Sequence, residues 1–301
     1  MLTVRAIGAL GVLSLAWMAC AAITLALLSA AWNGGFTLIA ALQWAGALLA
    51  GLQAVRIGRW LAAPPPSPEG VPLARDQAPS LYRLADRLAQ RAGAPAVDAI
   101  HITPDISAAV YQRPRWAWAG PMRTTLLIGL PLVHSVSARQ LGAIVAHEMG
   151  HLARQRRGAG AWGAHLRAWW HRVCERIAAD GSPAARLLHG AFEDWAEADL
   201  MDAVSLSHLE EYEADRVAAR VVGAALLGDA LVEVAMKARF IETDYWHKVM
   251  AQAAHLPRPR IRPFRDMGMG VAAGFNEQQR SGVLRSIVLS ETGQSLHPAL
   301  A

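Results

Sequence analysis

Residues 147–151 of the chain read His147-Glu148-Met149-Gly150-His151. Side chains four residues apart on a helix share a face, so the two imidazoles can bind one metal ion, with Glu148 beside it but not bound to it. Two histidine nitrogens, an open position for water and a carboxylate that accepts a proton are the components of a zinc hydrolase. The pattern alone also fits a helix with two unrelated histidines, so the surrounding sequence must decide.

The residues around this pattern predict a helix. Ser137 followed by Gln140 fits a capping box, and apolar residues then recur at helical spacing. The apolar positions are Leu141, Ile144, Val145 and Leu152. We therefore expect a helix from about Ser137 to Arg156. Gly150 costs such a helix about 1 kcal/mol relative to alanine, which indicates either a close approach by another element or a tolerated defect.

A third metal ligand is expected in the stretch Glu211-Tyr212-Glu213-Ala214-Asp215, inside a predicted helix from about Asp199 to Leu227. Glu211 and Asp215 share a face, so one carboxylate can bind a metal while the other accepts the free N–H of a ligand histidine. Glu213 points elsewhere. An isolated pair of carboxylates is usually a solvated acidic patch, but a preceding His-Glu-x-x-His helix favours metal binding.

The two motifs together resemble the membrane zinc metallopeptidases that include HtpX and the CAAX prenyl endopeptidases. In that family an HExxH motif is followed by ExxxD, and the first Glu of the second motif is the third zinc ligand. The resemblance covers about residues 75 to 298 of this chain. It implies one Zn²⁺ per chain, held by His147, His151 and Glu211.

The same resemblance assigns roles to residues around the metal. Glu148 is implied as the general base, and Asp215 as a residue that orients a ligand histidine. His297, near the C-terminus, is implied as a hydrogen-bond donor to the oxyanion. The substrate-binding strand of the family usually carries Asn-Ala, whereas this chain has Ser107-Ala108 in that place.

The predicted fold class is α+β, a mainly helical zincin-like metallopeptidase domain with a small antiparallel sheet. A helix that ends at Gly93 and short strands at residues 97–103, 106–111 and 124–130 precede the first motif. The strand from Ile106 to Tyr111 is the expected sheet edge, where an extended peptide substrate can add a strand.

An N-terminal transmembrane helical hairpin is predicted over residues 1–62, with spans at about 6–31 and 36–58. Hydrophobic residues make up 53% of the 301, and the mean hydropathy is +0.22. Both spans are about the 20 apolar residues that a bilayer requires. A cleaved signal peptide is the alternative for the first span. A Pro-rich linker at 63–73 then leads to the metallopeptidase domain at 74–301.

Arginines flank the hairpin at Arg5, Arg56 and Arg59, and the loop between the spans is uncharged. The positive-inside rule therefore predicts a multi-pass protein of the inner or plasma membrane with a cytoplasmic catalytic domain. Residues 159–178 mix tryptophan with arginine, which fits equally a helix at the lipid headgroups or one packed on the soluble domain. The net charge of +5 comes without a basic run interleaved with aromatics, so nucleic acid is not expected.

The sequence thus predicts a membrane-anchored zinc endopeptidase that acts on polypeptides, with misfolded membrane proteins as the expected substrates and the lipid bilayer as a partner. The alternative is a membrane-anchored sensor or scaffold with a structural zinc site. A structural site usually has four protein ligands and needs no base, so Glu148 favours the enzyme.

Overall fold

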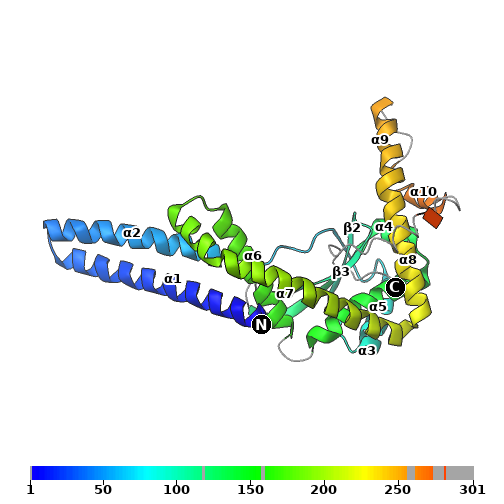
Figure 1. The fold of residues 1–301 in the computed structure, drawn as a ribbon, viewed down its shortest axis with the longest axis horizontal. Coiled ribbons are helices and arrows are strands. Elements are labelled where there is room, and N and C mark those ends of the chain that lie inside the picture. Colours follow the sequence, from blue (N-terminus) through cyan, green and yellow to red (C-terminus); the bar gives the residue numbers. More distant parts are fainter. Residues whose placement is uncertain (1, 117–118, 157–159, 256–261, 274–280, 283–301) are drawn as a thin grey trace. The chain divides into compact units, whose positions relative to one another are not determined.

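The computed structural model describes residues 2–116, 119–156, 160–255, 262–273 and 281–282, and it is mainly helical with one small sheet (Figure 1). The chain divides into two compact units. The hairpin unit comprises Met1–Pro65 and Trp162–Ala203, and the sheet unit comprises Pro66–Ala161 and Val204–Ala301. Residues 162–203 therefore group with the N-terminal helices, although they follow the first metal motif in the sequence.

Two long apolar helices, α1 (Leu2–Asn33) and α2 (Leu38–Leu61), lie side by side in the hairpin unit (Figure 1). Gly35, at φ +62°, makes the turn between them, and Thr37 caps α2 by accepting a hydrogen bond from the Ala40 N–H at 3.1 Å. By length and composition both helices could cross a membrane. Only 11% of each apolar window is buried within the protein, so most of this apolar surface faces outward.

Helix α6 (Gly160–Ala179) packs on the end of this hairpin and supplies hydrogen-bond donors to the last turn of α2. Its apolar residues Val173 and Ile177 are buried in one cluster with residues of α1 and α2. The Trp169 indole donates to the Leu61 carbonyl at 3.0 Å, and Arg176 donates to the carbonyls of Arg59 and Ala62 at 2.6 Å each. The last carbonyls of a helix have no partner within it, and α6 supplies donors for those of α2. The apolar side chains of α6 are therefore buried against the hairpin.

The sheet unit contains a four-stranded mixed sheet, and the prediction of an antiparallel sheet is wrong. Its strands are β1 (Val71–Leu73), β2 (Ala99–Thr103), β3 (Ala108–Trp116) and β4 (Ala119–Gly129), in the order β1-β2-β4-β3. β2 and β4 are parallel, and the other two pairs are antiparallel. The reason is that β3 and β4 form a hairpin that inserts β4 beside β2 and leaves β3 at the edge. The predicted edge strand is thus found at an edge, and it is longer than expected.

β1 lies inside the segment that was predicted to be only a linker. Tyr82 holds it in place, because its hydroxyl donates to the Leu73 carbonyl at 2.8 Å and accepts from the Ile100 N–H at 3.0 Å. Tyr82 belongs to α3 (Pro79–Ala92), which ends as predicted at Gly93, where φ is +70°.

The helices of the sheet unit surround α5 (Ala138–Arg156), which carries the first motif. The predicted capping box is confirmed: the Ser137 N–H donates to Gln140 Oε1 at 2.9 Å, and the Gln140 N–H donates to Ser137 Oγ at 3.3 Å. Ile100 and Leu126 of the sheet and Met149 of α5 are fully buried together in the core.

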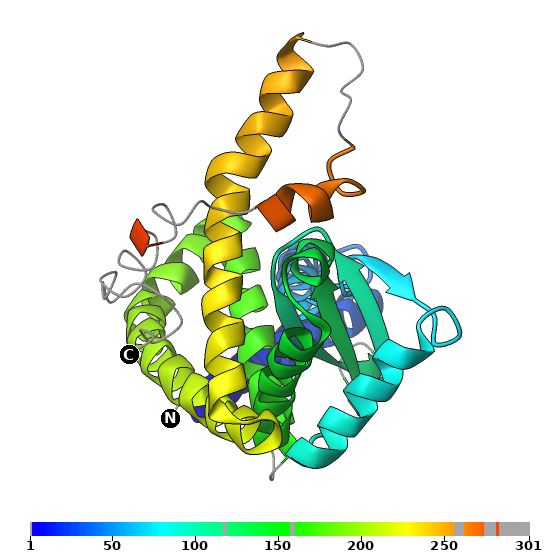
Figure 2. The same ribbon diagram turned by 90° about the vertical axis from the view of Figure 1, so that its right-hand side faces the viewer.

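The second motif lies on α7 (Pro183–Val222), and the predicted helix to Leu227 is in fact two helices. Gly223, at φ +94°, ends α7 and begins α8 (Ala224–Phe240), because a left-handed backbone interrupts a right-handed helix. Figure 2 shows α8 continuing as one rod through a π-helical turn (Ile241–Tyr245) into α9 (Trp246–His255). The short helices α4 (Leu130–Ser135) and α10 (Met267–Ala273) complete the described elements of the unit.

Candidate metal centre

The metal centre depends on a close approach of α5 and α7 at Gly150 and Ala214. A Cβ atom on Gly150 would lie 2.6 Å from the Ala214 carbonyl oxygen and 2.7 Å from the Ala214 Cα. These distances are too short for any side chain, so the two helix backbones are in contact at this point. Of the two explanations for Gly150, a close approach by another element is therefore the correct one.

This contact brings the two motifs together. His147 Nε2 lies 3.2 Å from His151 Nε2 and 3.3 Å from Glu211 Oε2, and His151 Nε2 lies 3.5 Å from Glu211 Oε1. A tetrahedral ion with bonds of about 2.0–2.1 Å needs ligand atoms roughly 3.3 Å apart. The spacing of the three side chains therefore fits a metal ion, and the group could hold one with a further position left open.

Asp215 fixes the orientation of the first ligand. The Nδ1–H of His147 donates to Asp215 Oδ1 at 2.8 Å. A carboxylate can only accept, so Nδ1 carries the proton and Nε2, which faces His151 and Glu211, is the nitrogen available for a metal. This contact agrees with the predicted role of Asp215, which is to orient a ligand histidine.

The centre is built to hold positive charge. Burial of His147 disfavours its charged form, but hydrogen bonds to Asp215 and Glu211 and the nearby charge of Glu148 outweigh this and raise the pKa of His147 to about 10. A proton therefore occupies the buried imidazole at neutral pH in the metal-free chain. A metal ion can take the place of that proton.

Glu148 and Glu213 are in different positions relative to the centre. Glu148 is half-buried beside its two histidine neighbours, and its charge acts on His147. Glu213 is exposed, and its carboxylate lies 3.7 Å from Arg216. Glu213 thus points away from the centre, as the helical spacing predicted.

The remaining predicted site residues lie outside the metal cluster. Ala108 is the first residue of β3, opposite Ile128 of β4, and the carbonyl of Ser107 accepts a hydrogen bond from the Gly129 N–H at 2.8 Å. Both residues therefore lie at the start of the edge strand. His297 falls outside the described residues.

The sequence interpretation missed the part played by Ala214. No role was predicted for Ala214, whereas its backbone is the surface against which Gly150 packs. A small residue in the middle of each motif was the signal that could have indicated this contact.

Comparisons of the chain with models of known protein families, with curated proteins and with solved structures find no match.

Substituting Gly150→Ala should separate α5 from α7, because the new Cβ would overlap the Ala214 backbone. We expect a loss of about 1–3 kcal/mol in the free energy of unfolding, together with weakened metal binding. Gly142→Ala on the same helix is the matched control, since its Cβ would make an ordinary contact with Leu84 Cδ1 at 3.8 Å. Thermal unfolding and metal content of both variants test this, and equal behaviour of the two would contradict it.

Metal binding should release protons in a way that follows the pKa of His147. At about pH 8, Zn²⁺ added to the metal-free chain should release about one proton per ion, because the imidazole is protonated below about pH 10 and unprotonated as a ligand. The affinity for the metal should therefore rise with pH, by up to about tenfold per unit. Calorimetry in buffers of different ionisation enthalpy measures the release.

Asp215→Asn is the companion variant for this measurement. It removes a hydrogen-bonded charge that raises the His147 pKa, so fewer protons should be released at the same pH. Absence of proton release from the parent chain at about pH 8 would disprove the assigned protonation state.

Proposed function

We propose that the chain is a membrane-anchored, zinc-dependent endopeptidase. The observation that carries this proposal is the set of ligand atoms of His147, His151 and Glu211, spaced 3.2–3.5 Å apart beside the carboxylate-bearing residue Glu148. Three protein ligands with an open position and an adjacent base are the components of a hydrolytic zinc site. The resemblance of the two motifs to HtpX and the CAAX prenyl endopeptidases supports the same activity.

Zinc is the metal that best suits this set of ligands. Imidazole nitrogens are borderline ligands and a carboxylate is a hard one, and Zn²⁺ takes both in four-coordinate geometry. Calcium and magnesium prefer sites made of oxygen ligands only.

Each residue of the centre has a separate role in the proposed peptide hydrolysis. A bound zinc ion supplies Lewis acidity, which makes water a better nucleophile and polarises a carbonyl. His147, His151 and Glu211 hold the ion, and Asp215 keeps the Nε2 of His147 directed at it. Glu148 accepts the proton of the attacking water and delivers it to the leaving amine. His297 is proposed as a hydrogen-bond donor to the oxyanion, on the resemblance alone.

The hairpin supports attachment to a membrane. Its two helices are long and apolar enough to cross a bilayer, and their outward faces carry apolar side chains that water would solvate poorly. By the positive-inside rule, Arg5, Arg56 and Arg59 support a cytoplasmic location for both ends of the hairpin. The proposed substrates are misfolded membrane proteins, which an enzyme anchored there meets at the bilayer surface.

The exposed edge of the sheet supports a polypeptide substrate. Among the described strands β3 pairs only with β4, which leaves its outer edge for an added strand, and Ser107 and Ala108 lie where β3 begins. An extended peptide that pairs with this edge would be held along its backbone, independently of its sequence.

Two substitutions separate catalysis from metal binding. Glu148→Gln should reduce proteolysis of casein by at least about a hundredfold, because it removes the base, while zinc content stays near one per chain. His147→Ala should lose both zinc and activity. Glu213→Gln is the matched control, since this carboxylate on α7 is exposed and paired with Arg216, and it should retain both.

The same measurements test the alternative of a sensor or scaffold with a structural zinc site. That alternative expects a zinc-loaded parent chain without turnover and a Glu148→Gln variant that matches it in every assay. Full activity of Glu148→Gln would refute the proposed mechanism, and an active chain without bound metal would refute the proposed centre.

A further inference from the structure

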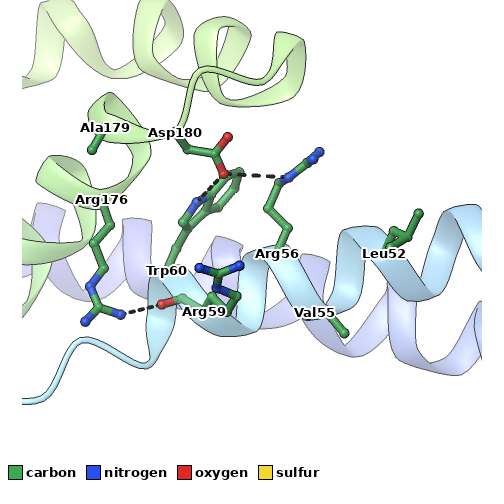
Figure 3. A pocket seen from close by; sticks show the side chains of 8 residues that line it. All are labelled: Leu52, Val55, Arg56, Arg59, Trp60, Arg176, Ala179 and Asp180. Carbon is green, nitrogen blue, oxygen red and sulfur yellow. Dashed lines mark hydrogen bonds and ion pairs between the residues drawn. The ribbon is translucent and has the colours of Figure 1, made fainter.

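The hairpin unit contains a cavity of about 680 Å³ between the last turns of α2 and the end of α6 (Figure 3). This volume is in the range of sites that bind small molecules or lipid headgroups. Its wall has a charged part, formed by Arg56, Arg59, Arg176 and Asp180, and an apolar part, formed by Leu52 and Val55. The proposed peptidase chemistry uses none of these residues.

The charged part of the wall has an excess of positive charge. Three guanidinium groups face the cavity with a single carboxylate, Asp180, so the formal net charge is +2. Asp180 already accepts a hydrogen bond from the Trp60 indole at 3.0 Å and lies 3.6 Å from Arg56 (Figure 3). These contacts fix the carboxylate on one side of the cavity and neutralise one arginine.

The other two arginines remain available to an anion. Arg176 is anchored by its bonds to the carbonyls of Arg59 and Ala62, which satisfy backbone oxygens without neutralising its charge. The Arg59 side chain is exposed, and within the described part of the chain it makes no hydrogen bond or ion pair. Guanidinium groups are well suited to phosphate oxygens, which accept two parallel hydrogen bonds from one arginine.

The apolar residues of the wall lie nearer the start of α2 than the arginines do. Leu52 and Val55 are exposed, and Leu52 lies seven residues before Arg59, roughly 10 Å along the helix axis. If α2 crosses a bilayer, the arginines lie at the headgroup level and the two apolar residues lie at the start of the acyl chains. A ligand with an anionic head and an apolar tail matches this wall, whereas a free phosphate ion would use only half of it.

We propose that this cavity is a binding site for the phosphate headgroup of an anionic phospholipid. The phosphate contacts Arg59 and Arg176, and the first carbons of an acyl chain lie against Leu52 and Val55. Basic pockets at the membrane end of transmembrane helices suit such lipids, because their charge adds to apolar contact at the same interface. The proposal rests on insertion of the hairpin in a membrane and is independent of the zinc chemistry.

The test uses the full-length chain in micelles of an uncharged detergent, titrated with phosphatidylglycerol and observed by native mass spectrometry. Arg59→Gln should weaken binding by roughly fivefold, the effect expected for one arginine at a membrane surface. Asp180→Asn should tighten it by a similar factor, because it removes the opposing charge, while the amide oxygen can still accept from Trp60.

The matched control is the double variant Arg83→Gln with Arg87→Gln. Both arginines are exposed on α3 and do not line the cavity. This variant removes two positive charges, whereas Arg59→Gln removes one. Its affinity for phosphatidylglycerol should equal that of the parent chain. An equal loss in the control and in Arg59→Gln would mean that lipid binds by general charge attraction, and the site would be rejected.

Two further results would overturn the proposal. Inorganic phosphate at millimolar concentration should not displace the lipid, and full displacement would show a site for a free anion. An Asp180→Asn variant that binds phosphatidylglycerol no better than the parent would show that the cavity charge is irrelevant. This second variant keeps the test decisive even where Arg59→Gln fails to fold.

Discussion

The backbone contact between Gly150 and Ala214 is the constraint on which the metal centre depends. His147 and His151 lie at positions −3 and +1 from Gly150, and Glu211 and Asp215 lie at the same offsets from Ala214 on the other helix. These offsets place each pair on the face that meets the partner helix. One point of contact therefore sets the positions of all four side chains, and a single methyl group there would move them apart.

The charges of the centre link folding to the binding of a cation. Glu211 and Asp215 are in contact with a buried histidine, and Glu148 adds a third carboxylate whose charge acts on it. Negative groups gathered in a poorly solvated place repel one another and lose hydration, so they need a positive partner. A proton on His147 serves this purpose in the metal-free chain. A divalent ion bound there would neutralise more of the same charge, and its binding energy would contribute to the stability of the fold.

The sequence was informative where structure is determined locally. The capping box at Ser137 and the end of α3 at Gly93 follow from short-range rules, and the structure agrees with both. The pairing of the two motifs is a long-range contact that was predicted from the family resemblance, and the structure brings their ligand atoms together. The parallel pairing of β2 with β4 was not predictable in this way, because it depends on where the β3–β4 hairpin inserts. The break at Gly223 was missed, although a glycine inside a predicted helix is a signal that could have indicated it.

The structure gives the tryptophans and arginines of α6 a role that the composition did not predict, which is to donate hydrogen bonds at the end of α2. The last carbonyls of a helix need hydrogen-bond donors, and α6 supplies them at the end of α2 through Trp169, Arg172 and Arg176. Each of these contacts satisfies an oxygen without bringing in negative charge. Two of these three donors are arginines, and Asp180 is already paired with a further arginine, Arg56 of α2. An anion from outside the chain would balance these charges, and for a hairpin inserted in a membrane, as proposed, the lipid headgroups would supply it.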